Sequence, residues 1–149
     1  LDPNNPPPDI DIKERNVLKV LVSKSNALLV QGKFIDIRDL KETAKNFLSN
    51  PQNREDLPQM EEKDIPGLGK VKVSKGVISL KNDRGTSYET YINVQNELAA
   101  AISELRDELS KQKYGVKFKD LTNADYSDAI SKAVPVAISE AEPENIGGK

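Results

Sequence analysis

The sequence predicts an α/β (α+β) fold in which helices pack on one face of a small mixed β-sheet. Three observations predict it: a β-prone run over residues 17–30, a strand-like run at 77–80, and two long stretches with apolar residues at spacings of three and four. A chain of 149 residues, of which 36% are hydrophobic, suits one domain with one core.

The first half of the predicted domain is a hairpin followed by a helix. Two β-prone runs within residues 17–30 are joined by a polar turn at Ser25-Asn26. Asp36 can cap the helix that follows, and apolar residues then recur on one face. We expect this helix to end just before Pro51, because the residue that precedes a proline avoids the helical ψ angle.

Residues 50–70 are predicted to form a long surface loop. The stretch contains three of the nine prolines around a mostly acidic middle, and a loop of this length is unusual inside a compact domain. Its Gly67-Leu68-Gly69-Lys70 lacks the spacing of a nucleotide-binding loop, so we assign no phosphate site to it. The β-prone runs on either side of Lys75-Gly76 are expected to form a hairpin or one bent strand.

The stretch VISLKNDRGTSYETY, residues 77–91, raises the question of a phosphate-binding loop. A strand, a glycine turn and a helix N-terminus follow one another, and helix N-termini bind anions. However, Gly85 stands alone, and Asp83 would place a negative charge where phosphates lie. A structural role fits better: Gly85 makes the turn, Thr86 or Ser87 caps the helix, and Asp83 favours its positive end.

The helix after this turn is predicted to span residues 88–114, with Gly115 as its C-terminal cap. At ~1.5 Å per residue it approaches ~40 Å, which exceeds what a small sheet needs. We therefore expect its far end to contact something else. A shorter helix capped by Thr122 ends before Pro135, and Val136–Ser139 is the last predicted strand.

Two absences limit the chemistry available to this protein. The sequence contains no His and no Cys, which removes the commonest general base, the commonest zinc ligand and the thiol nucleophile. The net charge of −2 argues against a nucleic-acid partner.

The carboxylates within 61–64 lie in the predicted loop, and those within 104–108 are expected on the solvated side of the long helix. Tyr88 and Tyr91 are expected in the core, so we predict no catalytic, cofactor or metal site and no enzyme activity.

One long part of the sequence resembles a known family. VISLKNDRGTSYETYINVQNELAAAISELRDEL, followed much later by VAISEAEP, is similar to the periplasmic domain of the ExbD/TolR family of biopolymer transport proteins. In that family, a strand that ends in an aspartate leads through a short turn to an aromatic residue that opens a helix. Asp83, Gly85 and Tyr88 occupy these positions here. Glu140 and Pro143 approximate the acidic residue and the proline that follow the family's last strand.

The resemblance implies a division of the chain. Residues 1–16 would be a proline-rich flexible linker that follows an absent transmembrane helix, residues 17–141 the periplasmic domain, and residues 142–149 a C-terminal tail. The stretches at about 50–70 and 111–133 would be insertions, as in the longer ExbD-like proteins of Bacteroidetes-type bacteria.

The resemblance also implies a function. The full-length protein would be a single-pass membrane protein and a homodimer on the periplasmic side of the bacterial inner membrane. With ExbB-like proton-channel subunits, it would use the proton-motive force to energise outer-membrane transport through a TonB-like partner. The family's proton-carrying aspartate lies in the absent membrane helix, so no residue of this chain inherits that role. The alternative is a TolR-like module that binds peptidoglycan in the Tol-Pal envelope system.

Two interaction surfaces are predicted on this basis. We expect two copies to pair through the last strand and the long helix, and a partner's extended segment to add to an exposed sheet edge. The residues expected at this interface are Val136, Ile138, Leu105 and Leu109. The proline-rich start favours an extended conformation that can dock to a partner. The residues of this docking segment are Leu1, Pro3, Pro6, Pro7 and Pro8.

Overall fold

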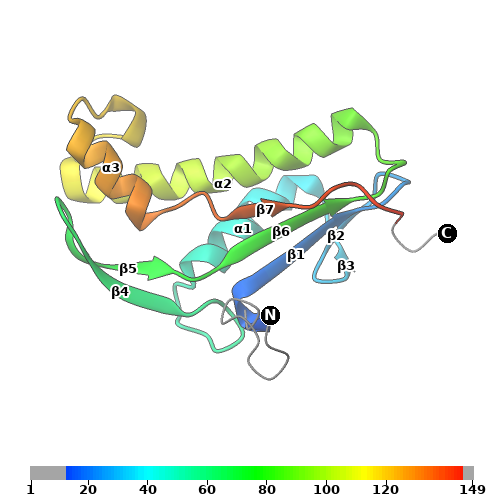
Figure 1. Ribbon diagram of the computed structural model, residues 1–149, viewed down its shortest axis with the longest axis horizontal. Coiled ribbons are helices and arrows are strands. Elements are labelled where there is room, and N and C mark those ends of the chain that lie inside the picture. The colour runs from blue at the N-terminus through cyan, green and yellow to red at the C-terminus, as the bar shows by residue number, and fades with distance from the viewer. Residues whose placement is uncertain (1–12, 146–149) are drawn as a thin grey trace, which may run out of the picture.

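The computed structural model describes residues 13–145 and has a mixed α+β architecture (Figure 1). Within these residues, a five-stranded sheet, a separate two-stranded sheet and three α-helices make up the fold. In chain order the elements are β1 (Val17–Val22), β2 (Leu28–Val30), β3 (Lys33–Phe34), α1 (Leu40–Ser49), β4 (Met60–Ile65), β5 (Gly69–Ser74), β6 (Val77–Asn82), α2 (Tyr88–Tyr114), α3 (Ala124–Ala133) and β7 (Ile138–Glu140). The predicted α+β class is confirmed.

The five-stranded sheet is mixed, with the strand order β3-β2-β1-β6-β7. β1 and β2 form the predicted antiparallel hairpin, in which Val20 lies opposite Val30. β1 runs parallel to β6, and β6 runs parallel to β7 after the chain returns through α2. β3 and β7 are therefore the edge strands, and each has one side without a strand partner in the described part of the chain.

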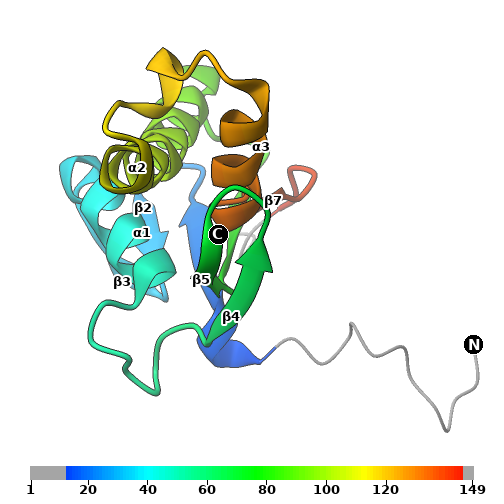
Figure 2. The same ribbon diagram turned by 90° about the vertical axis from the view of Figure 1, so that its left-hand side faces the viewer.

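One face of this sheet packs against α1 and α2. Buried residues alternate along β1 and β6, and Val20 and Leu80 are both fully inaccessible to solvent. Figure 2 shows both helices on the same side of the strands. The main core joins the sheet and both helices, and it consists of Leu18, Val20, Val22, Leu28, Val30, Leu40, Ala44, Phe47, Leu48, Ile78, Leu80, Val94, Leu98, Ala101 and Ile102.

α2 begins and ends at the predicted capping residues, whereas the predicted cap of the first helix starts a 3-10 turn and α1 begins only at Leu40. Asp36 accepts a hydrogen bond from the Arg38 N–H at 2.8 Å and starts a 3-10 turn that leads into α1. Ser87 caps α2 by accepting a hydrogen bond from the Thr90 N–H at 3.1 Å. Gly115 follows α2 in the left-handed conformation, with φ at 82°.

The predicted loop at 50–70 is wrong over its second half. β4 and β5 form an antiparallel hairpin in which Met60 lies opposite Ser74. Pro66-Gly67 turns the chain, and the φ of 92° at Gly67 is the value that a type II turn needs at its third residue. The strand pattern is hard to see in the sequence because β4 buries only Ile65 fully and exposes the charged residues before it.

β5 and β6 are consecutive but belong to different sheets, so no hairpin forms between them. Lys75-Gly76 separates the two strands, so one continuous bent strand does not form either. A side chain at Gly76 would place its Cβ 2.9 Å from Pro58 Cγ and 3.0 Å from Phe47 Cε2. Glycine is therefore favoured between the two strands because a larger residue would crowd the neighbouring side chains.

The two stretches predicted as insertions pack against each other. Ile65 and Val73 of the hairpin and Ala129 and Ala133 of α3 form a second, smaller core, and Leu109 of α2 packs against it. Figure 1 shows α3 and the hairpin at the same end of α2. The far end of the long helix thus contacts this second core, which accounts for a helix longer than the sheet requires.

Tyr114 fixes the end of α2 within this region. Its ring stacks on the ring of Tyr126, with 4.1 Å between centroids and 8° between planes. Its hydroxyl donates a hydrogen bond to the Gly67 carbonyl at 2.6 Å. One aromatic side chain therefore connects α2, α3 and the turn of the hairpin.

Three element boundaries differ from the predicted ones. α3 follows Asn123, whose Oδ1 accepts a hydrogen bond from the Asp125 N–H, so its cap lies one residue later than expected. β7 begins at Ile138 and not at Val136, because pairing with β6 starts there. A 3-10 turn at Glu14–Asn16 lies inside the stretch predicted as linker.

Candidate functional site

The glycine turn before α2 is a structural corner. The Gly85 N–H donates to Asp83 Oδ1 at 2.7 Å, and the Thr86 N–H donates to the Asp83 carbonyl at 2.9 Å. The Ser87 N–H donates to Asn26 Oδ1 at 2.9 Å. These N–H groups at the start of α2 already have acceptors, so they are not available to a phosphate.

The three residues that carry the family resemblance lie in different surroundings. Asp83 is buried, and Gly85 is tightly packed: a Cβ at this position would lie 2.9 Å from Lys24 Cβ. Tyr88 leaves 79% of its surface exposed, so the expectation that it packs in the core is wrong. Tyr91, almost one helical turn later, does pack against the main core.

The charged side of α2 is engaged within the chain and not simply solvated, contrary to expectation. Lys45 of α1 donates to Glu108 at 2.7 Å and to Glu104 at 3.1 Å, and Lys41 lies 2.5 Å from Glu104. The hydrogen bond to Glu108 is the main cause that raises the pKa of Lys45, and Lys41 is the main cause that lowers the pKa of Glu104. These ion pairs tie α1 to α2. Within residues 13–145, no cluster of three or more acidic side chains could hold a metal ion.

The outer edge of β7 is the candidate interaction site. The Ala137 carbonyl accepts a hydrogen bond from β6, and the Ala141 N–H donates one to β6. In a parallel pair, alternate residues direct both backbone groups to the partner strand, so Ser139 bonds to β6 and its two neighbours direct their N–H and C=O groups outward. Ile138 and Glu140 therefore present backbone donors and acceptors on the open side. Val136, just before the strand, is 66% exposed.

The four residues predicted at the dimer interface do not form one surface. Val136 and Ile138 line a hollow of about 180 Å³ between β7 and α2. Leu105 and Leu109 line another cavity, of about 400 Å³, between α2 and the hairpin. Leu105 packs against the main core and Leu109 against the second core. The strand edge and the two helix residues therefore belong to separate sites.

Side chains of α2 hold both ends of the β7 segment. Arg106 Nε donates to the Val134 carbonyl at 2.8 Å, and burial lowers the pKa of Arg106. Tyr91 and Gln95 both donate hydrogen bonds to the Glu140 carboxylate. The strand is thus fixed in position while its outer edge stays open. The sequence reasoning missed these contacts, because nothing in a helical pattern reveals which distant carbonyl or carboxylate lies beside it.

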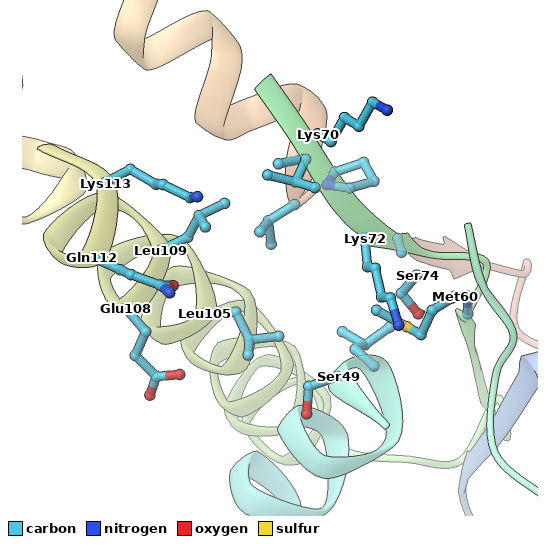
Figure 3. A pocket seen from close by; sticks show the side chains of 17 residues that line it. Ser49, Met60, Lys70, Lys72, Ser74, Leu105, Glu108, Leu109, Gln112 and Lys113 are labelled. Atoms are coloured by element: carbon cyan, nitrogen blue, oxygen red, sulfur yellow. Dashed lines mark hydrogen bonds between the residues drawn. The ribbon is translucent and has the colours of Figure 1, made fainter. Parts of the chain in front are cut away.

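The cavity between α2 and the hairpin is the second candidate site (Figure 3). Its walls are largely apolar, and its apolar lining residues are Leu48, Met60, Val71, Leu105, Leu109, Ala133, Val134, Pro135 and Ala137. Lys70, Lys72 and Lys113 also line it. The sequence reasoning missed this site because it predicted a loop in place of the hairpin. Pro66-Gly67 followed by Gly69 was the signal that could have revealed the hairpin turn.

The predicted docking segment lies outside the described residues; its members are Leu1, Pro3, Pro6, Pro7 and Pro8. At the start of the described chain, Arg15 Nε donates to the Leu57 carbonyl at 2.6 Å. Asn16 Oδ1 accepts from the Gln59 N–H at 3.0 Å. These two bonds anchor the residues before β1 on the segment before β4.

No helix within residues 13–145 combines the length and the apolar character that crossing a bilayer requires. No family model matches this chain, and no curated protein matches it. The kinship with the ExbD/TolR family is therefore a proposal that depends on the sequence motifs and their order.

Proposed function

We propose that this chain is the periplasmic domain of an ExbD-like subunit of a proton-motive-force-driven inner-membrane motor. Two copies pair, and the pair works with ExbB-like proton-channel subunits and a TonB-like energy transducer to energise outer-membrane transport. The role of this chain is mechanical: it dimerises and binds partner proteins. The observation that carries the proposal is the open outer edge of β7 beside the exposed side chain of Val136.

An open strand edge favours pairing because it offers backbone donors and acceptors at regular spacing. In β7 these groups belong to Ile138 and Glu140. Tyr91 and Gln95 already hold the Glu140 side chain, so the strand loses little conformational entropy when a second strand adds to it. β3, the opposite edge strand, is only two residues long and offers less backbone for such pairing.

Cross-linking of the full-length precursor in its own membranes tests the proposal. The chain contains no Cys, so a single Val136→Cys substitution supplies the only thiol on this chain. Disulfide formation requires Cα atoms within about 7 Å. We expect Val136→Cys to give cross-linked dimers under mild oxidation. Phe34→Cys is the matched control, because Phe34 is 74% exposed on the opposite edge of the same sheet. Equal cross-linking from both positions would contradict pairing through β7.

Sedimentation of the purified domain provides a second test of pairing. Val136→Asp places a charge beside the β7 edge on an exposed side chain and should shift the protein to monomer. Phe34→Asp should leave assembly unchanged. A monomer for the unsubstituted chain at the highest concentration would contradict the dimer.

A TolR-like module that binds peptidoglycan is the second candidate function. A hollow of about 390 Å³ at the start of α2 favours it, because Arg84, Tyr88 and Tyr91 line this hollow. A cation beside aromatic rings suits a ligand that carries both carboxylates and sugar rings. Purified peptidoglycan should then retain the domain in a pull-down, and Tyr88→Ala should release it. Retention without any TonB-like partner would favour this function over the first.

A further inference from the structure

The cavity between α2 and the hairpin has an open strand edge along one wall. Within the described residues, β5 pairs with β4 alone. The Lys75 N–H donates to the Gln59 carbonyl at 2.9 Å, and this bond sets the alternation of the antiparallel ladder. The odd-numbered residues of β5 form the backbone hydrogen bonds to β4. Lys70, Lys72 and Ser74 therefore direct their N–H and C=O groups away from β4.

These outward groups face the cavity. Lys70, Lys72 and Ser74 all line it, and so does Val71, whose side chain points to the other face of the strand. Because residues from both faces of β5 line the cavity, the cavity lies along the edge of this strand. Within residues 13–145, no backbone–backbone hydrogen bond outside the hairpin uses the N–H or C=O groups of these outward-facing residues.

Most residues of the opposite wall are apolar, and they come from the end of α1, from α2 and from the segment around the end of α3. α2 contributes Leu105 and Leu109, and the segment after α3 contributes Val134 and Pro135. β7 pairs with β6 from Ile78 onward, and the segment just before β7 lines the cavity together with β5. The volume of about 400 Å³ lies in the range of sites that hold a small ligand or a few side chains.

The charges at this cavity are mainly basic. Lys70, Lys72 and Lys113 lie within 4.0 Å of no carboxylate among the described residues. Glu108 also lines the cavity, but its carboxylate is held by Lys45 at 2.7 Å. Figure 3 shows Lys113 of α2 extending toward β5, and Lys72 of β5 beside Ser74 and Met60. An occupant of this site therefore meets Lys113 on one wall and Lys72 on the other, and Glu62 and Asp64 lie opposite Lys72 and Lys70 across the hairpin.

We propose that this cavity binds an extended peptide segment of a partner protein whose side chains alternate between apolar and acidic. The segment adds to the open edge of β5 as a third strand of the hairpin sheet. Its apolar side chains contact Leu105 and Leu109, the acidic side chains of its other face pair with Lys72, and Lys113, one turn after Leu109, attracts the acidic segment from the α2 wall. Alternation fits the site because successive side chains of a strand point to opposite faces. The site is independent of the β7 edge, so it does not depend on the function proposed above.

Selection from a displayed library of random heptapeptides tests the specificity of this site. We expect enriched sequences that alternate apolar residues with Asp or Glu. A synthetic peptide of the enriched sequence should bind at least about tenfold more weakly to Lys72→Glu and to Lys113→Glu, which corresponds to about 1.4 kcal/mol or more. Lys119→Glu is the matched control, because Lys119 is an exposed lysine that does not line the cavity. Enrichment of no sequence, enrichment of basic sequences, or equal binding by all three variants would overturn the proposal.

Amide exchange locates the bound peptide and separates it from another kind of ligand. The N–H groups of Lys70, Lys72 and Ser74 should exchange at least about tenfold more slowly with the peptide bound, because they become hydrogen-bonded. Dodecanoate serves as the probe for a small amphiphilic anion. Binding of dodecanoate in place of the peptide, without protection of these amides, would overturn the peptide site and assign the cavity to amphiphiles.

Discussion

Asn50 connects the end of α1 to the segment that leads to the hairpin. It is buried, and its backbone is left-handed, with φ at 37°. Its Nδ2 donates to the carbonyls of Arg54 and Pro58 at 3.0 and 2.8 Å, and its Oδ1 accepts from the Arg54 N–H at 2.8 Å. Asparagine suits this position because it adopts the left-handed region more readily than other non-glycine residues.

We expect Asn50→Ala to lower the free energy of unfolding by about 2–4 kcal/mol. Each lost hydrogen bond contributes about 1 kcal/mol, and the left-handed backbone adds about 1 kcal/mol of strain. Urea unfolding at neutral pH measures the loss. Asn53→Ala is the matched control, since Asn53 also has a positive φ, 51°, but is exposed and makes no side-chain hydrogen bond in the described structure. Equal losses in the two variants would show that the buried hydrogen bonds do not matter.

Tyr91 gives the protein a pH-dependent contribution to stability. Burial, followed by the hydrogen bond to Glu140, raises the pKa of Tyr91 to about 12. An unfolded tyrosine has a pKa of about 10. The neutral phenol is favoured in the folded state, so this contribution is complete below pH 10 and is lost as the pH rises from about 10 to about 12.

Urea unfolding at a series of pH values from 9 to about 12 tests this expectation. Tyr91→Phe should show a shallower loss of stability above pH 10 than the unsubstituted protein. Tyr88→Phe removes an exposed hydroxyl and should keep the original slope. Identical slopes in all three proteins would contradict the assigned role of Tyr91.

At the scale of the elements, Tyr114 joins α2 to the two smaller units at its end. We expect Tyr114→Ala to raise amide exchange in the β4–β5 hairpin and α3 by at least about tenfold, because their opening becomes easier. The amides of β1 and β6 should not change, since the main core contains no residue of the hairpin or of α3. Hydrogen exchange followed by NMR measures both sets of amides.

Tyr88→Ala is the control for this experiment because Tyr88 begins the same helix and is largely exposed. It should leave exchange in the hairpin unchanged. A uniform increase across β1, β6 and the hairpin in Tyr114→Ala would mean that the protein opens as one cooperative unit and that the second core has no stability of its own.

At the scale of the whole molecule, the two cores predict that the hairpin can be removed without loss of the main sheet. Gln59 and Lys75 are cross-strand neighbours joined by a 2.9 Å backbone hydrogen bond. An Asn-Gly turn can therefore replace residues 60–74, because two-residue turns close a hydrogen-bonded pair. We expect β1 and β6 to keep their amide protection in this variant.

α3 should lose its protection in the same variant, at least about tenfold in exchange rate, because Ala129 and Ala133 lose Ile65 and Val73 as packing partners. A dye that fluoresces on exposed apolar surface should bind the variant and not the parent. Complete unfolding, or an α3 that stays protected, would contradict the division into two cores. The variant also removes the proposed peptide site and keeps the β7 edge, so cross-linking through Val136→Cys should persist.

The local elements could be predicted wherever the apolar period was clear. The hairpin at 17–30 and the helix at 88–114 both have unbroken patterns, and both are observed. The hairpin at 60–74 was missed because its charged side chains face solvent and leave too few buried positions to form a period. Of the candidate site, the last strand was predicted, although the observed strand begins at Ile138. The cavity was not predicted, because it depends on the missed hairpin.

The sequence by itself determined the α+β class, the capping of α2, and the structural role of the turn at Gly85, since all three depend on residues close together in the chain. Only the tertiary structure decided that the two apparent insertions share a core, that β7 lies at an open edge, and that Leu105 and Leu109 line a cavity. The physical reason is that packing partners come from segments far apart in the sequence, and hydrophobic burial is non-directional. A periodic pattern shows which residues are buried, but it does not show what buries them.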